Sequence, residues 1–325
     1  YVQPQVKFAY LLLTLGRYSE GWKFHLIRMH SENNNRFTIP PEISTPQWQG
    51  ESVVGKSILV WPEQGFGDEV QFVRYLSILK ANGAKQLFLV CKEPLVSLFS
   101  TLECIDEVIS LDKFCVSDAV KMDYWSFIMD FPFYFNTTLS SIPTSLPYLT
   151  VLEKKKKYWS DYLPKPLFRV GLVWKGSESH KNDAHRSLAS LSVLNPLWGV
   201  EGISFISLQK GAGEEEAMNP SEDQPLLHLG GKIQDFSDTA AIITQLDLII
   251  CVDTAIAHLA GALNKPCWVL LPQHNTDWRW LLDRDDSPWY PDVLHLFRQV
   301  SDGDWDEVVQ RLVISLREKV GGYIE

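Results

Sequence analysis

The chain has 325 residues, which is long for one average domain and predicts two. Its 45% hydrophobic and 22% charged residues are typical of a globular protein with a substantial core. The net charge of −10, from 30 basic and 40 acidic residues, argues against a general nucleic-acid-binding protein. No apolar run approaches the length of a bilayer span and no secretory signal opens the chain, so we expect no transmembrane segment.

The chain has five cysteines, an odd number, and they lack the spacing of metal ligands. His180 and His185 are spaced like ligands on a helix, but their stretch is polar and no Cys or paired carboxylate completes the set. Three cysteines lie in or beside apolar strands, where a free thiol behaves as a small hydrophobe. We therefore expect a reducing, cytoplasmic compartment and no metal site. The cysteines are Cys91, Cys104, Cys115, Cys251 and Cys267.

Residues 1–30 predict a helical hairpin, because apolar residues recur at helical spacing on both sides of Gly16. The pattern from Ala9 through Leu15-Gly16-Arg17-Tyr18 to Glu20-Gly21-Trp22 resembles a tetratricopeptide repeat. One unit is visible, whereas such units stack to bury their faces. Because the chain opens without Met, we favour the last unit of a truncated array over a lone hairpin packed on the main body. Residues 31–55, polar and rich in Asn and Pro, indicate a linker.

Strands that alternate with helices follow, as in parallel βαβ units. The expected strands of a first domain, residues 56–160, are 57–61, 86–91, 108–111 and 127–130, with helices near 69–81 and 95–102. A basic run at 154–157 and two prolines mark the boundary. The second domain, residues 161–325, has expected strands at 168–174, 203–208, 248–252 and 267–271, and closes with an amphipathic helix at 304–319. We predict two α/β domains with a cleft between them.

The stretch from Leu246 to Pro272 is a strand–helix–strand unit. Asp253 and Thr254 stand where an N-cap belongs, just after a buried strand, and small residues open the helix. Ligands bind outside the carboxyl ends of strands in open α/β sheets, and a helix start there suits an anion. An ordinary capped helix is the alternative interpretation.

A glycine-rich turn, Glu63-Gln64-Gly65-Phe66-Gly67-Asp68, follows the first strand. It fails as a dinucleotide fingerprint, since Val70 stands where the third glycine belongs. Asp68 opens a helix at a strand's carboxyl end, so it is either a helix cap or a general base beside a substrate hydroxyl.

A cationic loop, residues 174–187, follows the first strand of the second domain. Its cations, Lys175, Lys181 and Arg186, suit phosphate oxygens, although a solvated loop is the usual cause of such a charge run. Four aromatic residues near the C-terminus could form a stacking wall, but leucines between them favour core packing. They are Trp278, Trp280, Trp289 and Tyr290.

Together the turn 63–68, the loop 175–187 and the stretch 252–260 resemble the glycosyltransferase family 9 heptosyltransferases. The hairpin, the Pro46-Gln-Trp48-x-Gly50 linker and the segment 277–290 are similar to the tetratricopeptide-linked bacterial subgroup of that family. The resemblance covers nearly the whole chain. It implies the GT-B fold, two Rossmann-like domains with donor bound by the second and acceptor mainly by the first, and inverting transfer without a divalent metal or other cofactor.

The resemblance also implies roles for single residues. Asp68 corresponds to the catalytic base, and the acceptor loop comprises Gln64, Gly65, Phe66 and Gly67. Asp253, Thr254 and Ala255 match the turn that holds the donor diphosphate, with Ala255 replacing the usual glycine. Arg186 or Lys181 takes the place of a phosphate-binding lysine, aided by Lys175. Gln209 and Lys210 lie where relatives contact the base, and residues 214–216 near the ribose. His258 sits one turn into its helix, so it is either a ligand contact near the proposed phosphate or a satisfied, partly buried histidine.

The implied function is transfer of a sugar from a nucleoside-diphosphate sugar, with ADP-heptose as the default donor, to a protein or glycan acceptor. Contact with a membrane surface is compatible with this assignment, whereas a nucleic-acid partner is not expected. Two alternatives stay open: a non-catalytic repeat scaffold that binds partners through the hairpin, and a GT-B-shaped sugar-nucleotide epimerase.

Overall fold

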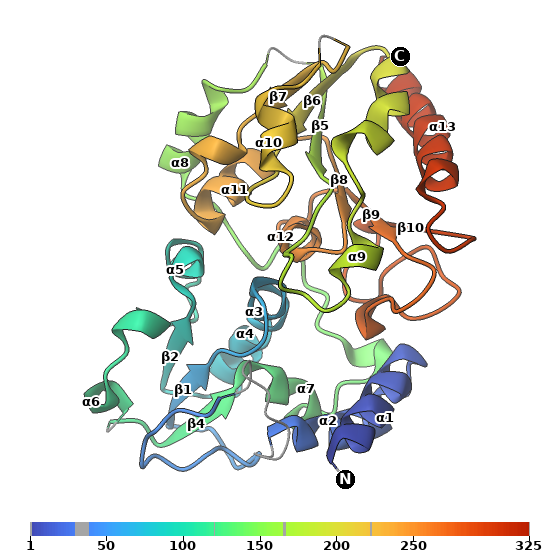
Figure 1. Cartoon of the computed structure of the whole chain (residues 1–325). Coiled ribbons are helices and arrows are strands. Elements are labelled where there is room, and N and C mark those ends of the chain that lie inside the picture. Colours follow the sequence, from blue (N-terminus) through green and yellow to red (C-terminus); the bar gives the residue numbers. More distant parts are fainter. Residues whose placement is uncertain (1, 30–38, 120, 165–166, 222, 325) are drawn as a thin grey trace. The chain divides into compact units, whose positions relative to one another are not determined.

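The computed structural model describes residues 2–29, 39–119, 121–164, 167–221 and 223–324. The chain divides into two compact units, residues 1–150 and 151–325 (Figure 1). Each unit is built on a sheet whose paired strands are all parallel among the described residues. The expected α/β class is therefore confirmed.

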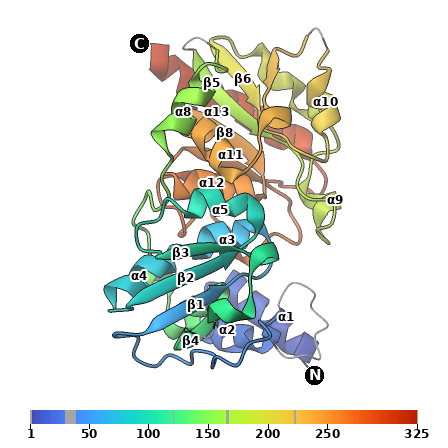
Figure 2. The same cartoon turned by 90° about the vertical axis from the view of Figure 1, so that its left-hand side faces the viewer.

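The sheet of unit 1 has the order β3-β2-β1-β4 (Figure 2). Every residue of the central strand β1 is buried, as expected of a parallel strand covered on both faces. The last predicted strand, 127–130, is wrong: β4 pairs with β1 through residues 124–127, and 128–130 turn into a 3₁₀ helix. The strands are β1 (Ser57–Trp61), β2 (Gln86–Cys91), β3 (Glu107–Ser110) and β4 (Tyr124–Phe127).

The helix predicted at 69–81 is two helices, α3 (Phe66–Phe72) and α4 (Tyr75–Ala81). The break has a local cause. Arg74 is buried, and its Nε donates to the Gln71 carbonyl at 2.8 Å, an acceptor that a continuous helix would use itself. The remaining helices of this part are α5 (Glu93–Phe99), α6 (Val116–Ala119) and α7 (Phe131–Tyr134).

The amino-terminal segment forms two packed helices, α1 (Val2–Thr14) and α2 (Tyr18–His25), followed by a 3₁₀ turn, Leu26–Met29. Gly16 has φ +72° at the connection, a conformation that favours glycine. Trp22 is buried and donates its indole N–H to the Thr137 carbonyl at 3.0 Å, which attaches the hairpin to the sheet-bearing part of unit 1. Its identity as a tetratricopeptide unit stays a prediction.

The predicted linker, residues 31–55, is described from residue 39 onward, and residues 31–38 lie outside the described part of the chain. Its later part runs beside β4: the Trp48 N–H donates to the Trp125 carbonyl at 2.7 Å, and the Trp125 N–H donates to the Pro46 carbonyl at 3.0 Å. The Trp48 side chain is buried against Phe131 and Tyr134. This stretch is thus packed along the sheet of unit 1.

The sheet of unit 2 has the order β10-β9-β8-β5-β6-β7. The predicted strands at its centre are found within one residue of their expected ends, whereas β7 and β10 have no counterpart in the prediction. These two strands lie at the sheet's edges, where β7 is short and β10 mixes polar with apolar residues. The strands are β5 (Phe168–Val173), β6 (Ile203–Ser207), β7 (Leu226–His228), β8 (Leu248–Val252), β9 (Cys267–Leu271) and β10 (Leu294–Arg298).

The carboxy-terminal helix α13 (Trp305–Ile324), red in Figure 1, packs its apolar face on this sheet. Val308, Leu312 and Leu316 are fully buried there, and they share a cluster with the strand residues Val170 and Leu172. The other helices are α8 (Glu153–Ser160), α9 (Asp183–Arg186), α10 (Glu214–Met218), α11 (Phe236–Ile243), α12 (Ala255–Ala262) and the 3₁₀ segment Leu191–Gly199. Across the described residues, no helix combines the length and apolar character that crossing a membrane requires.

Candidate functional site

The strand order of each sheet reverses next to its first strand. In unit 2 the chain proceeds from β5 to β6 and β7 on one side and places β8, β9 and β10 on the other. In unit 1 it proceeds from β1 to β2 and β3, and β4 lies on the other side of β1. Ligands of open α/β sheets bind at the carboxyl ends of strands at such a reversal. The segments after β5, β8, β1 and β4 are therefore the candidate sites.

In unit 2, helix α12 begins directly after β8. Thr254 is its N-cap, with an extended backbone, and its Oγ1 accepts from the Ile256 N–H at 3.2 Å. The side chains of the first turn are partly exposed, and the helix axis presents its positive end at the sheet's carboxyl edge. Backbone N–H groups at this start are suited to phosphate oxygens. Of the two residues expected at the N-cap, Thr254 supplies the capping side chain and Asp253 does not.

Arg186 reaches this turn from helix α9. Its Nη1 donates to the Asp253 carbonyl at 2.8 Å, and its Nε lies 3.4 Å from Asp183 Oδ1. A Cβ on Gly176 would lie 2.5 Å from the Arg186 Nη2, so glycine there leaves room for the guanidinium. Lys181, by contrast, is exposed. The fold therefore brings Arg186 to the start of α12.

The Asp253 carboxyl group has a pKa raised to about 6, chiefly because burial disfavours its charged form. The neighbouring Asp277 carboxylate raises the pKa further, while Arg186 acts in the opposite direction.

Gln209 follows β6 and is 1% exposed. Its Oε1 accepts from the N–H groups of Trp174 and Lys175, at 2.9 and 3.1 Å. Its Nε2 donates to the carbonyls of Lys175 and Ala212, at 3.0 and 2.7 Å. Both amide atoms are thus used in joining the segments after β5 and β6, so the side chain shapes the turn from within.

Beside this turn, Lys175 Nζ lies 3.1 Å from Glu216 Oε1, and both side chains are about one quarter exposed. Lys210 is exposed, and its Nζ lies 3.4 Å from the Gly230 carbonyl. Glu214 accepts from the Gly211 N–H at 2.8 Å and lies 3.4 Å from His228 Nε2. Residues that follow β5 and β6 or end β7 therefore contact one another at this edge of the sheet.

His258 lies one turn into α12 and is 5% exposed. Its Nδ1 is 3.0 Å from the Tyr290 hydroxyl, and its ring stacks on Trp280 at 5.3 Å between centroids. The four carboxy-terminal aromatic residues are all buried, which confirms the prediction that they form core. Through these contacts His258 packs α12 against Trp280 and Tyr290.

In unit 1, Asp68 lies in the first turn of α3, just after β1, and is partly exposed. Its Oδ2 accepts from the Gly65 N–H at 2.8 Å, so the carboxylate holds the turn and also faces solvent. Gln64 has φ +62°, a conformation that a non-glycine residue adopts only when its surroundings hold it. The acceptor-loop residues Gln64, Gly65, Phe66 and Gly67 thus form one tight turn with Asp68 at its end.

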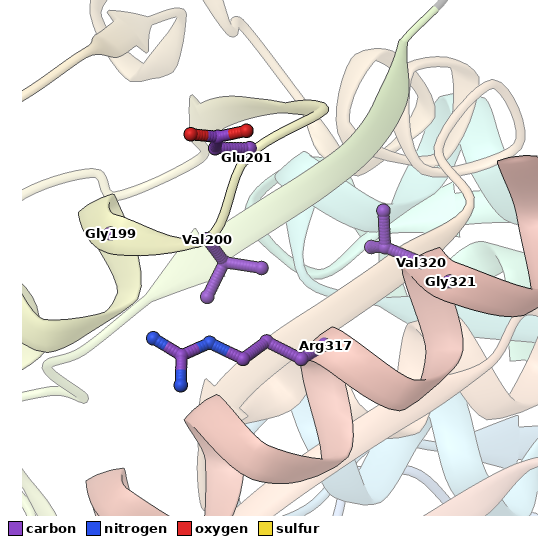
Figure 3. Close-up of a pocket in the computed structure, with 6 residues that line it drawn as sticks. All are labelled: Gly199, Val200, Glu201, Arg317, Val320 and Gly321. Atoms are coloured by element: carbon purple, nitrogen blue, oxygen red, sulfur yellow. The ribbon is translucent and has the colours of Figure 1, made fainter.

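A cavity in unit 2 lies away from these segments. Figure 3 shows it between the start of β6 and α13, and its lining comprises Gly199, Val200, Glu201, Arg317, Val320 and Gly321. Residues 199–201 precede β6, so this cavity is at the amino edge of the sheet, away from the strand ends that carry Thr254 and Arg186. None of the predicted site residues lines it.

Two groups at the candidate sites escaped the sequence analysis. The Arg28, Glu63 and Asp130 side chains form a buried ion cluster after β1 and β4. Glu69, buried beside Asp68, pairs with Lys92, and burial raises its pKa to about 6. Sequence patterns did not reveal Glu63 and Glu69, because their cationic partners, Arg28 and Lys92, are far from them along the chain.

Comparisons with known proteins agree with this architecture. Residues 202–277 match the model of glycosyltransferase family 9 (heptosyltransferase), a segment that includes Gln209, Thr254 and His258. Protein FlbA of Caulobacter vibrioides is 29% identical over 336 residues, covering 95% of this chain and 54% of that protein. The chain thus spans about half the length of this curated relative.

Two solved structures are similar in fold. The Escherichia coli ADP-heptose LPS heptosyltransferase II superposes with a TM-score of 0.61 at 16% identity, over 83% of this chain and 100% of that one. A glycosyltransferase family 9 protein from Veillonella parvula gives 0.58 at 15% identity, over 83% and 98%.

Two parallel α/β units with candidate sites at their strand reversals define a protein with the fold of the GT-B heptosyltransferases. Within unit 2, residues 202–277 are similar to glycosyltransferase family 9 (heptosyltransferase), and the solved structures support the fold.

Proposed function

We propose that the protein transfers a sugar from a nucleoside-diphosphate sugar to a hydroxyl of a protein or glycan acceptor, with inversion at the anomeric carbon. ADP-heptose is the donor that we expect, and the cytoplasm is the compartment. The observation that carries the proposal is the start of α12 at the strand reversal, where Arg186 donates to the Asp253 carbonyl. The family match spans this helix start.

In this proposal the donor diphosphate binds at the first turn of α12. The helix N-terminus and the Arg186 guanidinium would stabilise the negative charge that grows on the leaving diphosphate, with Lys175 nearby. Arg186 is suited to this role because a guanidinium can donate to two oxygens at once. These groups would supply positive charge without a divalent metal.

Asp68 acts as the general base. The acceptor oxygen forms a bond to the anomeric carbon while the bond from that carbon to the diphosphate oxygen breaks. The acceptor proton passes to Asp68, and the nucleoside diphosphate leaves with the electron pair. A single displacement of this kind inverts the configuration. The partial exposure of Asp68 at the carboxyl end of β1 supports this role.

The first test concerns the donor. Thermal unfolding is measured with ADP-, UDP-, GDP- and CMP-linked sugars, with and without EDTA, because a ligand that binds only the folded form raises its stability. We expect ADP-heptose to raise the melting temperature with EDTA present. No shift with any nucleotide sugar would favour a non-catalytic scaffold, and an isomerised donor without acceptor would indicate an epimerase.

The second test concerns Asp68. General-base help is worth ~10²–10⁴-fold in rate, so Asp68→Asn should lower turnover by that order and leave donor affinity unchanged. ADP release from ADP-heptose measures the rate, and calorimetry measures ADP binding. Asp112→Asn, an exposed aspartate of the same unit, is the matched control. Full turnover in Asp68→Asn would exclude the assignment.

A further inference from the structure

The strand reversal of unit 1 is filled by the chain's own charged groups. Glu63 follows the end of β1 by two residues, and Asp130 follows the end of β4 by three. The Arg28 guanidinium lies between them, contributed by the 3₁₀ turn that ends the hairpin. The Arg28 side chain is 1% exposed, and those of Glu63 and Asp130 are fully buried.

The contacts within this ion cluster are short and directional. Arg28 Nε donates to Glu63 Oε2 at 2.9 Å, and Nη2 donates to Glu63 Oε1 at 2.5 Å, which makes the pair bidentate. The same Nη2 donates to Asp130 Oδ1 at 2.6 Å. Arg28 Nη1 donates to the His25 carbonyl at 3.1 Å, so the guanidinium also bonds to the backbone at the end of α2.

Two further donors support the carboxylates. The Met129 N–H donates to Glu63 Oε1 at 3.2 Å, and Gln47 Nε2 donates to Asp130 Oδ2 at 3.3 Å. Taking three charges out of water is costly, and the cost is offset only when every partner is in place. The three side chains of the ion cluster therefore favour a single geometry. The segments that carry them are held in place by the same contacts.

The cluster connects directly to the turn that carries Asp68. Glu63 is followed by Gln64, whose φ of +62° requires support, and then by Gly65, whose N–H donates to Asp68 Oδ2. We propose that Arg28 is a positioning residue for Asp68, acting through Glu63, so that the hairpin orders the turn in which the general base stands. This inference rests on the function proposed for Asp68.

Arg28 is not the only attachment of the hairpin. Trp22 donates to the Thr137 carbonyl at 3.0 Å and is buried, and Thr137 Oγ1 lies 2.9 Å from the Tyr75 hydroxyl. We expect these contacts to remain when Arg28 is replaced and to keep the hairpin attached. The effect of the substitution is then concentrated on Glu63, Asp130 and the turn 63–68.

The experiment compares Arg28→Met with Arg17→Met in the full chain. Arg17 is in the same hairpin and also pairs with a carboxylate, Glu20, at 2.6 Å, but on the exposed surface. Hydrogen–deuterium exchange is measured on peptides that cover residues 62–72. Hydrolysis of ADP-heptose, measured as ADP release, gives kcat and the donor KM.

We expect Arg28→Met to raise exchange in residues 62–72 and to lower kcat by ~10–100-fold, since a displacement of ~1 Å can cost ~10²-fold. The donor KM and the affinity for ADP should be unchanged, because the donor residues are in unit 2. Arg17→Met should match the wild type in every readout. A purely structural role of Arg28 would lower the yield of folded protein and leave kcat per folded molecule unchanged.

Unchanged exchange or unchanged kcat in folded Arg28→Met would overturn the inference. If that variant does not fold, combining Arg28→Met with Glu63→Gln and Asp130→Asn removes the three charges together, and the same rise in exchange and fall in kcat are expected. The Asp68→Asn variant separates the two proposals. Loss of activity in Asp68→Asn with wild-type behaviour in the Arg28 variants rejects only the positioning role, whereas full activity in Asp68→Asn rejects the base assignment itself.

Discussion

Arg186 and Lys181 lie five residues apart in the same loop, but their surroundings differ. Arg186 donates to the Asp253 carbonyl and packs over Gly176, whereas Lys181 lies on the surface of the same loop. The sequence alone does not distinguish the two as candidates for phosphate binding, because both fit a loop of this composition. The α9 turn decides which one reaches α12.

Arg186→Met should weaken ADP binding. A hydrogen bond to a charged group contributes ~1.5–3 kcal/mol, which corresponds to roughly 10–100-fold in the dissociation constant. Isothermal titration with ADP is the measurement, and Arg317→Met is the control, an exposed arginine of the same unit beside the cavity at the amino edge. Equal affinity in the wild type and Arg186→Met would remove Arg186 from the donor site.

Asp130 makes folding stability depend on pH. Burial, and secondarily the Glu63 carboxylate, raises its pKa from 3.8 to about 6, against the opposing effect of Arg28. The native state therefore binds a proton more tightly than the unfolded state does, and the contribution of Asp130 to stability falls as pH rises from about 4 to about 6. The effect at neutral pH is at most about 3 kcal/mol.

Asp130→Asn removes this titration while keeping the side chain's shape. The free energy of unfolding of Asp130→Asn minus that of the wild type should be larger at about pH 7 than at about pH 4. The reason is that only the wild type carries the buried charge at neutral pH. Urea unfolding at the two pH values gives both differences. Asp112→Asn, at an exposed site, should differ from the wild type by the same amount at both pH values. A pH-independent difference for Asp130→Asn would contradict the raised pKa of Asp130.

At the scale of elements, α12 combines a capped start with close packing along its length. The Thr254 hydroxyl holds its first turn, and Gly261 lies so near Tyr290 that an added Cβ would fall 2.3 Å from the ring. The helix is therefore fixed at one end by a hydrogen bond and farther along by an aromatic side chain. An anion site needs that rigidity, since its N–H groups must point at one place.

Thr254→Ala tests whether the cap serves the site as well as the helix. Loss of an N-cap costs about 1 kcal/mol of stability. Asp304→Ala is the matched control, because the Asp304 carboxylate accepts from the Glu307 N–H at 3.1 Å at the start of α13. Both variants should lose similar stability by urea unfolding, but only Thr254→Ala should lose affinity for ADP. Equal ADP affinity in the two variants would make the cap purely structural.

At the scale of the whole molecule, the sequence predicted the elements whose residues are uniformly apolar. The strands 57–61, 86–91, 248–252 and 267–271 have the predicted bounds, because buried parallel strands appear as continuous apolar runs. The edge strands β7 and β10 lack such runs, and the break between α3 and α4 depends on an Arg74 side chain that no local pattern reveals.

The helix starts that carry the candidate site residues were predicted to a similar extent, and the functional roles of those residues stay predictions. Thr254 and Asp68 could be located because each opens a helix after a strand, which a sequence pattern indicates. The ion cluster could not, because its members are separated by 35 and 102 residues and meet only through the fold. The role of Gln209 was equally hidden, since its position after a strand does not tell whether the amide points outward or joins two loops.

The buried cluster of Arg28, Glu63 and Asp130 also restricts how such a protein can be recombined. A helical hairpin at the front of an enzyme invites exchange with another repeat unit, yet this one supplies the cation for two buried carboxylates. A graft that lacked an arginine at this place would leave both anions uncompensated. Any exchanged hairpin must therefore carry the arginine with it, or the glutamate and aspartate must be replaced in the same step.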